Sequence, residues 1–214
     1  MPMPRYAACA MLLLLVAQWG CSKTVVVPVP PRMDLKSYGT IGVVTFDSNS
    51  DHAMSTYATQ QFQEQIQGAV PGTPLLELGN RLAVLESVGA SQLDAEALTK
   101  IGKKYHVNAV FIGYLVYSEP KTDIRVADIT KLQGGVRTEV RGDISSKLME
   151  TKSGASVWSG SAWAKRQVGA VSVSTKRGVN ASLNDGNPRK EMVPSLMHHL
   201  TEDFRGRMVR QKVQ

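Results

Sequence analysis

Three carboxylates lie where a small acidic site could form. Asp47 and Asp51 follow an apolar run from Thr40 to Phe46, and Glu86 follows a second apolar run over residues 82–85. If both runs are parallel strands, these carboxylates lie at the carboxyl edge of a sheet, where ligands often bind. Turn formation and helix capping explain such residues more simply. We therefore expect structural roles for them, and an enzyme acting through Asp47 is the weakest of our functional hypotheses.

The histidines do not have the spacing of a metal site. His198 and His199 are adjacent, so on a helix they point about 100° apart and cannot bind one ion together, as an i, i+4 pair could. We expect one to pack and the other to be solvated. His52 and His106 lie at predicted helix ends, where capping explains them. The sequence also lacks a nucleophile elbow, a phosphate loop, a GxGxxG turn and paired CxxC or HExxH motifs. It therefore predicts no catalytic residues, no metal and no cofactor.

Cys21 is the residue with the clearest predicted modification. Arg5 and the apolar stretch Ala10–Ala17 are typical of a signal peptide, and this stretch is shorter than the ~20 apolar residues that span a bilayer. Removal of residues 1–20 would take Cys9 with it and leave Cys21 as the new N-terminus and the only thiol. This position favours acylation with fatty acids such as palmitate. Ordinary secretion with an unmodified thiol is the alternative.

Two tryptophans and several cations are candidates for binding a partner. Trp158 and Trp163 are five residues apart, so on a strand they face opposite sides. We expect one in the core and the other exposed as an anchor, because interface hot spots favour Trp and Arg. The candidate partner-binding residues are Trp158, Trp163, Lys165, Arg166, Lys176 and Arg177.

Charge divides the chain into two unlike halves. Residues 21–120 carry 7 Lys and Arg against 9 Asp and Glu, net −2, whereas residues 121–214 carry 17 against 9, net +8. For an exported chain, the anionic partners would be phospholipid headgroups, lipopolysaccharide phosphates or acidic proteins. Nucleic acid is in the wrong compartment. A dispersed, solvated basic surface is the plain alternative.

The elements that would position these residues follow from periodicity. A β-α-β-α-β order with short connections predicts right-handed crossovers and a mainly parallel sheet. Its predicted strands are residues 40–46, 82–85 and 108–117, and its helices cover 54–69 and 93–105. The fold class is therefore α/β, with a βαβαβ parallel core extended by an antiparallel β-ribbon and with a C-terminal helix packed on the sheet.

The ribbon and the chain ends complete this prediction. A long strand over 136–148 turns at 152–154 and returns over 155–164, residues 167–188 form a polar hairpin or a mobile loop turning at 176–178, and a last helix covers 189–210. Ser22–Pro31 is rich in Val and Pro, which predicts an extended tether or, alternatively, an edge strand. The expected organisation is a signal peptide over 1–20, a lipidated tether over 21–37 and one periplasmic domain over 38–210.

Several stretches resemble a known group of envelope proteins. They are a first strand ending in Phe46-Asp47, the helix-to-strand step IGKKYHVNAVFIGY, and the turn METKSGASVWSG. Together they resemble bacterial envelope lipoproteins that include the curli secretion lipoprotein CsgG, the lipoprotein activators of penicillin-binding proteins and the N-terminal domain of the TolB type. Gly20-Cys21 likewise resembles a lipobox, from which Gln18 and Trp19 depart. The resemblance implies a mixed α/β domain in the periplasm and does not choose its task.

The leading hypothesis is a membrane-anchored periplasmic lipoprotein that acts as a non-enzymatic binding or assembly factor for another envelope protein. Ser22 lacks the aspartate associated with inner-membrane retention in lipoproteins, which favours the outer membrane. The alternative is a homo-oligomeric outer-membrane secretion channel resembling the curli lipoprotein. Membrane-crossing strands need ~9–11 residues with an apolar row. The rows in 168–174 and 179–183 are shorter, and 136–148 alternates with polar residues, so this reading stands second.

Overall fold

The computed structural model describes residues 23–128, 133–174, 178–183 and 186–213. The chain divides into two compact units, Met1–Pro30 with Gly206–Gln214, and Pro31–Arg205. In the first unit, β1 (Lys23–Val29) pairs antiparallel with β10 (Arg207–Val213). The tether prediction is therefore wrong over Lys23–Val29, and the strand alternative is correct there. The β-branched residues of KTVVVPV favour an extended strand once β10 supplies a partner.

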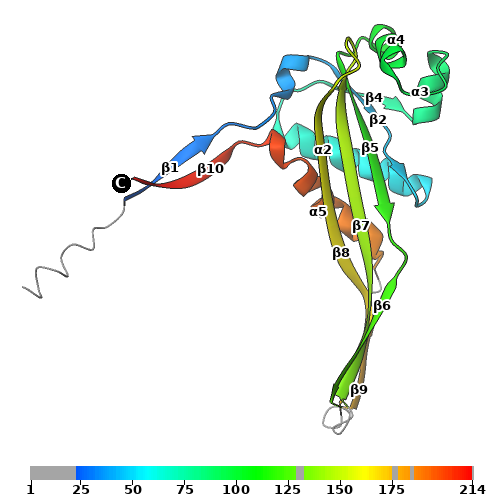
Figure 1. Ribbon diagram of the computed structural model, residues 1–214, viewed down its shortest axis with the longest axis vertical. Helices are drawn as coiled ribbons and strands as arrows, with labels where there is room; N and C mark the ends of the chain where they lie inside the picture. Colours follow the sequence, from blue (N-terminus) through cyan, green and yellow to red (C-terminus); the bar gives the residue numbers. More distant parts are fainter. Residues whose placement is uncertain (1–22, 129–132, 175–177, 184–185, 214) are drawn as a thin grey trace, which may run out of the picture. The chain divides into compact units, whose positions relative to one another are not determined.

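The second unit is a mixed sheet with helices packed on it (Figure 1). Its strands are β2 (Ile41–Val44), β3 (Asp47–Ser48), β4 (Leu75–Gly79), β5 (Ala109–Tyr117), β6 (Lys121–Asp128), β7 (Gln133–Glu150), β8 (Ser156–Ser174) and β9 (Gly178–Leu183). Its helices are α2 (His52–Ala69), α3 (Arg81–Ser87), α4 (Ala95–Tyr105) and α5 (Pro188–Leu200), with 3-10 turns η1 (Leu35–Tyr38) and η2 (Glu202–Phe204). The strand order is β4-β2-β5-β7-β8-β9, with β3 beside β5 and β6 beside β7.

Strand directions confirm the predicted fold class. β2 runs parallel to both β4 and β5, whereas β5, β7, β8 and β9 are successively antiparallel. Among helices of the described residues, none is long and apolar enough to cross a membrane.

The second parallel strand was predicted in the wrong place. Residues 82–85 belong to α3, and the strand is β4, just before them. The Asn80 side chain accepts a hydrogen bond from the Ala83 N–H at 2.8 Å and so begins the helix. Leu82 is exposed while the consecutive residues Val84 and Leu85 are both buried, a pattern typical of one side of a helix. An apolar run this short fits a strand or one helical turn equally well.

Helices α2 and α5 cover one face of the sheet. Their buried side chains meet β5, β7 and β8 in a large core, so the predicted packing of the C-terminal helix on the sheet is confirmed. Within it, Phe111 contacts Phe62, Trp158 and Phe204 with ring centroids 4.9, 6.0 and 5.9 Å away. The predicted helix over 189–210 is too long, because α5 ends at Leu200 and the η2 turn brings Phe204 into this aromatic core.

Helices α3 and α4 cover only one end of the opposite face. Leu98 and Ile101 of α4 pack on Val110 and Ile112 of β5. Further along the same strand, Tyr114 and Val116 point the same way, because alternate side chains share a face, and both are exposed. The remainder of this face is therefore open.

Beyond the helices, β7 and β8 continue into a four-stranded ribbon with β6 and β9 (Figure 1). Gly169–Ser174 of β8 pair antiparallel with Gly178–Leu183 of β9, as the hairpin alternative predicts for this part of 167–188. Residue 188 already belongs to α5, and Lys176 and Arg177 lie outside the described residues. Strand β6 was not predicted, although Lys121, Asp123 and Arg125 alternate with Thr122, Ile124 and Val126 as in a strand with one polar side.

Candidate functional site

The uncovered part of the sheet forms the candidate site, here called the open face. It is defined by Tyr114 and Val116 of β5, Arg141, Asp143 and Ser145 of β7, and Ser161, Trp163 and Lys165 of β8. Strand register brings them together in rows: Val116 lies beside Asp143 and Asp143 beside Trp163, while Tyr114 lies beside Ser145 and Ser145 beside Ser161. Residues from three strands thus share one surface.

Trp163 is the largest apolar group of this surface, with an exposed fraction of 59%. The Arg141 guanidinium carbon lies 4.9 Å from the centroid of its ring, a cation–π arrangement. Asp143 accepts hydrogen bonds from Arg141 Nε at 2.8 Å and Nη2 at 2.5 Å. These bonds raise the pKa of Arg141. The guanidinium is therefore held as a permanent cation beside an exposed indole.

A second arginine and aromatic pair stands at the other end of the open face. The Arg81 guanidinium carbon lies 5.6 Å from the Tyr114 ring centroid, and Nη1 donates to the tyrosine hydroxyl. The same nitrogen is 3.5 Å from Asp47 Oδ2. Between the two pairs lies a hollow of about 270 Å³ that includes Val116, Ser145 and Ser161. The site thus combines exposed aromatic and aliphatic side chains, a central hollow lined by Val116 and two serines, and two arginines that stack on aromatic rings. This composition suits binding more than catalysis.

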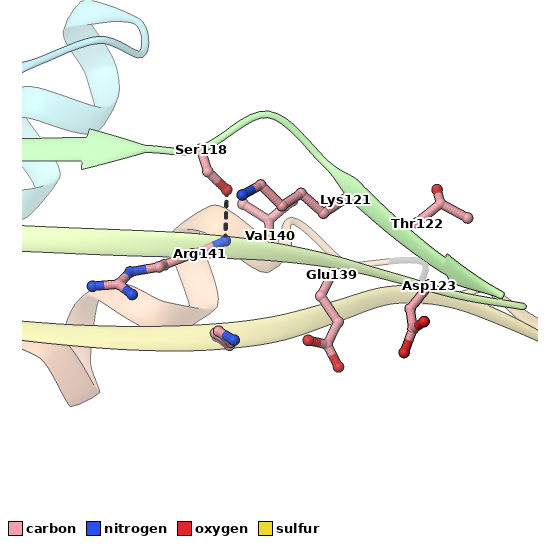
Figure 2. A pocket seen from close by; sticks show the side chains of 8 residues that line it. Ser118, Lys121, Thr122, Asp123, Glu139, Val140 and Arg141 are labelled. Atoms are coloured by element: carbon pink, nitrogen blue, oxygen red, sulfur yellow. Dashed lines mark hydrogen bonds between the residues drawn. The ribbon is translucent and has the colours of Figure 1, made fainter. Parts of the chain in front are cut away.

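A further hollow of about 280 Å³ adjoins the open face where the chain passes from β5 to β6 (Figure 2). Figure 2 shows Ser118 Oγ accepting the backbone N–H of Arg141, a bond of 3.1 Å. Its lining includes both signs of charge, with Lys121 and Lys165 against Asp123 and Glu139. This mixed lining does not select an anion or a cation.

Two of the three carboxylates considered for an acidic site have structural contacts. Asp51 caps α2, since its Oδ1 accepts the Met54 N–H at 2.8 Å, as the capping interpretation predicts. Asp47 pairs with Arg81, and Glu86 is exposed on α3. No group of three or more His, Cys, Asp or Glu that could hold a metal occurs in the part of the chain that the structure describes.

The histidine prediction was wrong in one respect. His198 and His199 are both exposed, because the buried side of α5 is formed by Leu196, Met197 and Leu200 around them. His198 Nδ1 lies 2.5 Å from Arg205 Nη1, and His199 Nδ1 lies 3.0 Å from Glu202 Oε1. His106 ends α4 with a left-handed backbone (φ 55°), which agrees with its predicted capping position.

The predicted partner-binding residues separate between two faces. Trp158 is buried among Phe111 and Phe204, and its Nε1 donates to Asp203 Oδ2 at 3.2 Å. Trp163 points to the opposite side, as its spacing predicts. Lys165 shares the open face, whereas Arg166 lies on the helix-covered side, with Nε 3.8 Å from Glu191 Oε2. Cys21, Lys176 and Arg177 lie outside the described residues.

Sequence reasoning missed Tyr114, Val116, Arg141 and Asp143 as members of the site. Tyr114 and Val116 belong to the apolar run NAVFIGYLVY, which looks buried throughout. One signal was available. Tyr114 and Val116 follow Val110 and Ile112 at period-2 spacing, so all four side chains share one face of the strand. The helix that packs on this face is short and covers only Val110 and Ile112.

No known protein-family profile matches the chain, and no curated protein matches it. Solved structures with a similar fold include the PelC dodecamer from Paraburkholderia phytofirmans, with 12% identity, a TM-score of 0.44, and coverage of 86% of this chain and 99% of that one. Lipoprotein GNA1162 from Neisseria meningitidis has 15% identity, a TM-score of 0.38, and coverage of 73% and 93%. The LpoB C-terminal domain from Escherichia coli has 12% identity, a TM-score of 0.35, and coverage of 72% and 94%.

These likenesses concern the fold alone and carry no functional argument. One of these neighbours is named a lipoprotein, and that name belongs to the neighbour alone. The CsgG and TolB parts of the envelope-lipoprotein resemblance stay predictions.

Proposed function

We propose that the chain is a lipoprotein of the bacterial cell envelope, anchored through Cys21 to the outer membrane and facing the periplasm, and that it acts non-enzymatically as a binding or assembly factor. Its partner is another envelope protein, which docks on the open face. The observation that carries this proposal is the gathering of Trp163, Tyr114 and Val116 on an uncovered sheet surface.

Exposure of these three side chains has a free-energy cost that burial against a partner would remove. Tyr114 and Val116 are 40% and 50% exposed, and Trp163 more so. Each buried aromatic or branched side chain contributes roughly 1.5–3 kcal/mol. Contiguous exposed apolar patches on soluble surfaces mark interaction sites, and Trp, Tyr and Arg are the residues that dominate interface energetics.

The proposed lipid anchor is inferred from the sequence around Cys21. Membrane fractionation tests this proposal. The full chain should pellet with membranes and dissolve in detergent, whereas Cys21→Ala should remain with the soluble periplasmic fraction or stay unprocessed. Each buried CH₂ of an acyl chain contributes ~0.8 kcal/mol, so loss of several chains should release the protein. Equal membrane retention of both forms at the same processed mass would contradict lipidation, because an unprocessed Cys21→Ala chain would still be held by its signal peptide.

A second candidate function is a subunit of an oligomeric outer-membrane secretion channel. The ribbon favours it, because its register aligns Ile124, Val136, Val171 and Ala181 in one apolar row across four strands. Ile124 is 69% exposed. This row was not apparent from individual strands, whose separate apolar stretches are short.

The native mass of the detergent-extracted species separates the two candidates. A binding module should extract as a monomer or dimer, and a channel should extract as a ring of many subunits. A detergent-stable ring would make the channel the leading account.

A further inference from the structure

Strand β8 has an edge that is paired at one end only. β7 pairs with β8 from Ser156 to Val173, but β9 pairs only with Gly169–Ser174. Among the described strands, none lies against the outer edge of β8 from Ser156 to Arg166. In an antiparallel pair, every second residue of such an edge directs its N–H and C=O outward. This stretch therefore offers a row of backbone donors and acceptors.

The free edge lacks the usual protection against pairing. From Ser156 to Ala164 its sequence is SVWSGSAWA, without proline or a charged residue. Edge strands commonly carry Lys, Pro or inward charges that prevent addition of another strand. Strand β6, at the edge of the ribbon, shows such protection, with Lys121, Asp123 and Arg125 along it. The free edge of β8 is thus built to accept a strand.

Resting on the proposed function, we infer that the partner contributes an extended, acidic segment that adds as a strand to β8 along Ser156–Arg166. Strand addition would place alternate side chains of the segment beside Trp163 and the hollow of the open face. Backbone hydrogen bonds would supply affinity, and the Trp163 side of the sheet would supply selectivity.

The charge of this edge argues for an acidic segment. Lys165 is exposed on the open face at one end of the free stretch, whereas Arg166 lies on the other face beside Glu191. Lys147 lies beside Ser159 on the neighbouring strand. Opposite charge favours association and fixes register.

A second copy of this chain fits the edge less well. The other end of the sheet is β4, whose sequence LLELG spans only Leu75–Gly79 and carries one carboxylate, Glu77. It would leave much of the free stretch of β8 unpaired. Strand β6 carries alternating charges of both signs. The free stretch of β8 in a second copy would match in length but would bring a second Lys165 to the interface. An acidic segment of another protein matches both length and charge.

Selection of phage-displayed random dodecapeptides on the full chain in detergent tests this inference. Enriched peptides should carry Asp or Glu and apolar residues at every second position. Hydrogen exchange of the complex should show protection of about half of the amides from Ser156 to Arg166. Lys165→Glu should weaken peptide binding about fivefold or more, while Lys103→Glu on α4 should leave it unchanged.

Addition of an acidic strand from a partner would be overturned by the absence of enriched peptides or by enrichment of peptides without acidic residues. It would also be overturned by concentration-dependent protection of the β8 edge without peptide, which would assign the edge to a second copy. Peptides that bind through Trp163 but leave the β8 amides unprotected would refute strand addition and leave the open-face function standing.

Discussion

Thr59 of helix α2 is hydrogen-bonded to the segment that follows strand β2. Its hydroxyl accepts the Phe46 N–H at 2.9 Å and donates to the Ser55 carbonyl at 2.8 Å, in a buried position. Thr59→Val should leave that N–H without a partner and cost about 1–3 kcal/mol of unfolding free energy. Thr56→Val is the matched control, because the Thr56 hydroxyl only donates to the His52 carbonyl within the helix. If urea titrations gave the same loss of unfolding free energy for both variants, the assigned role of the Thr59 hydroxyl would be contradicted.

Gly160 leaves room for the buried Trp158 ring. A Cβ at Gly160 would lie 2.5 Å from Trp158 Cζ2, whereas nothing lies within 4 Å of a Cβ at Gly68. Gly160→Ala should therefore destabilise the protein by about 1–3 kcal/mol through overpacking. Gly68→Ala, in helix α2, should stabilise it by about 0.4–1 kcal/mol. Thermal unfolding measures the stability of both variants. A Gly160→Ala variant that is more stable than the wild type would show that the Trp158 ring moves aside without loss of stability.

At the residue scale, spacing predicted which tryptophan faces which way but could not predict the arginine pairs. The five-residue separation of Trp158 and Trp163 fixes opposite faces on any regular strand. The stacking of Arg141 on Trp163 depends on the register between β7 and β8, which places Asp143 beside Trp163. Register follows from tertiary packing, so the sequence alone left Arg141 and Asp143 out of the site.

Helix α4 depends on the cap at its first turn. Asp94 accepts the Ala97 N–H at 2.8 Å, and this hydrogen bond lowers the pKa of Asp94 from its ordinary value of 3.8. A lowered pKa means that the cap stabilises the fold above the unfolded-state pKa and that this contribution is lost as pH falls through the folded-state value.

A pH series tests this cap. The stability advantage of the wild type over Asp94→Ala should be largest near neutral pH and should shrink below about pH 4. The advantage over Asp94→Asn should change with pH in the same direction, because asparagine keeps a cap but does not titrate. A difference that grows on acidification would have the wrong sign for a lowered pKa.

At the element scale, long periodic segments were predictable and short ones were not. The helix containing Phe62 and Ile66 and the strand containing Phe111 were found from their patterns. The run Leu82–Leu85 was assigned as a strand because four apolar residues fit one helical turn or a short strand equally well. The Asn80 cap is the feature that marks the helix. Strand β1 was ambiguous because its partner, β10, lies at the far end of the sequence.

At the scale of the whole molecule, the open face results from unequal helix coverage. Helices α2 and α5 span their face of the sheet, while α3 and α4 reach only Val110 and Ile112 on the other. Sequence predicted that helices pack on the sheet, but the extent of cover depends on where they cross it. The docking surface was therefore invisible in the sequence, even though its central residue, Trp163, was a candidate.

Two exposed apolar surfaces compete as the functional one, namely the open face around Trp163 and the ribbon row around Ile124. Trp163→Ala should leave stability within about 1 kcal/mol of wild type, since the exposed indole contributes mainly its stacking with Arg141. Circular dichroism melts measure this. A larger loss would mean that Trp163 belongs to the fold and not to a docking surface.

The most direct test of the open face as a docking surface is photocrosslinking in the native envelope. A benzoylphenylalanine replaces Trp163 in one strain and Ile124, which is exposed to a similar extent, in a matched strain. The account predicts a covalent adduct with another envelope protein from position 163 and none from position 124. An adduct only from position 124, or adducts only with further copies of this chain, would contradict it.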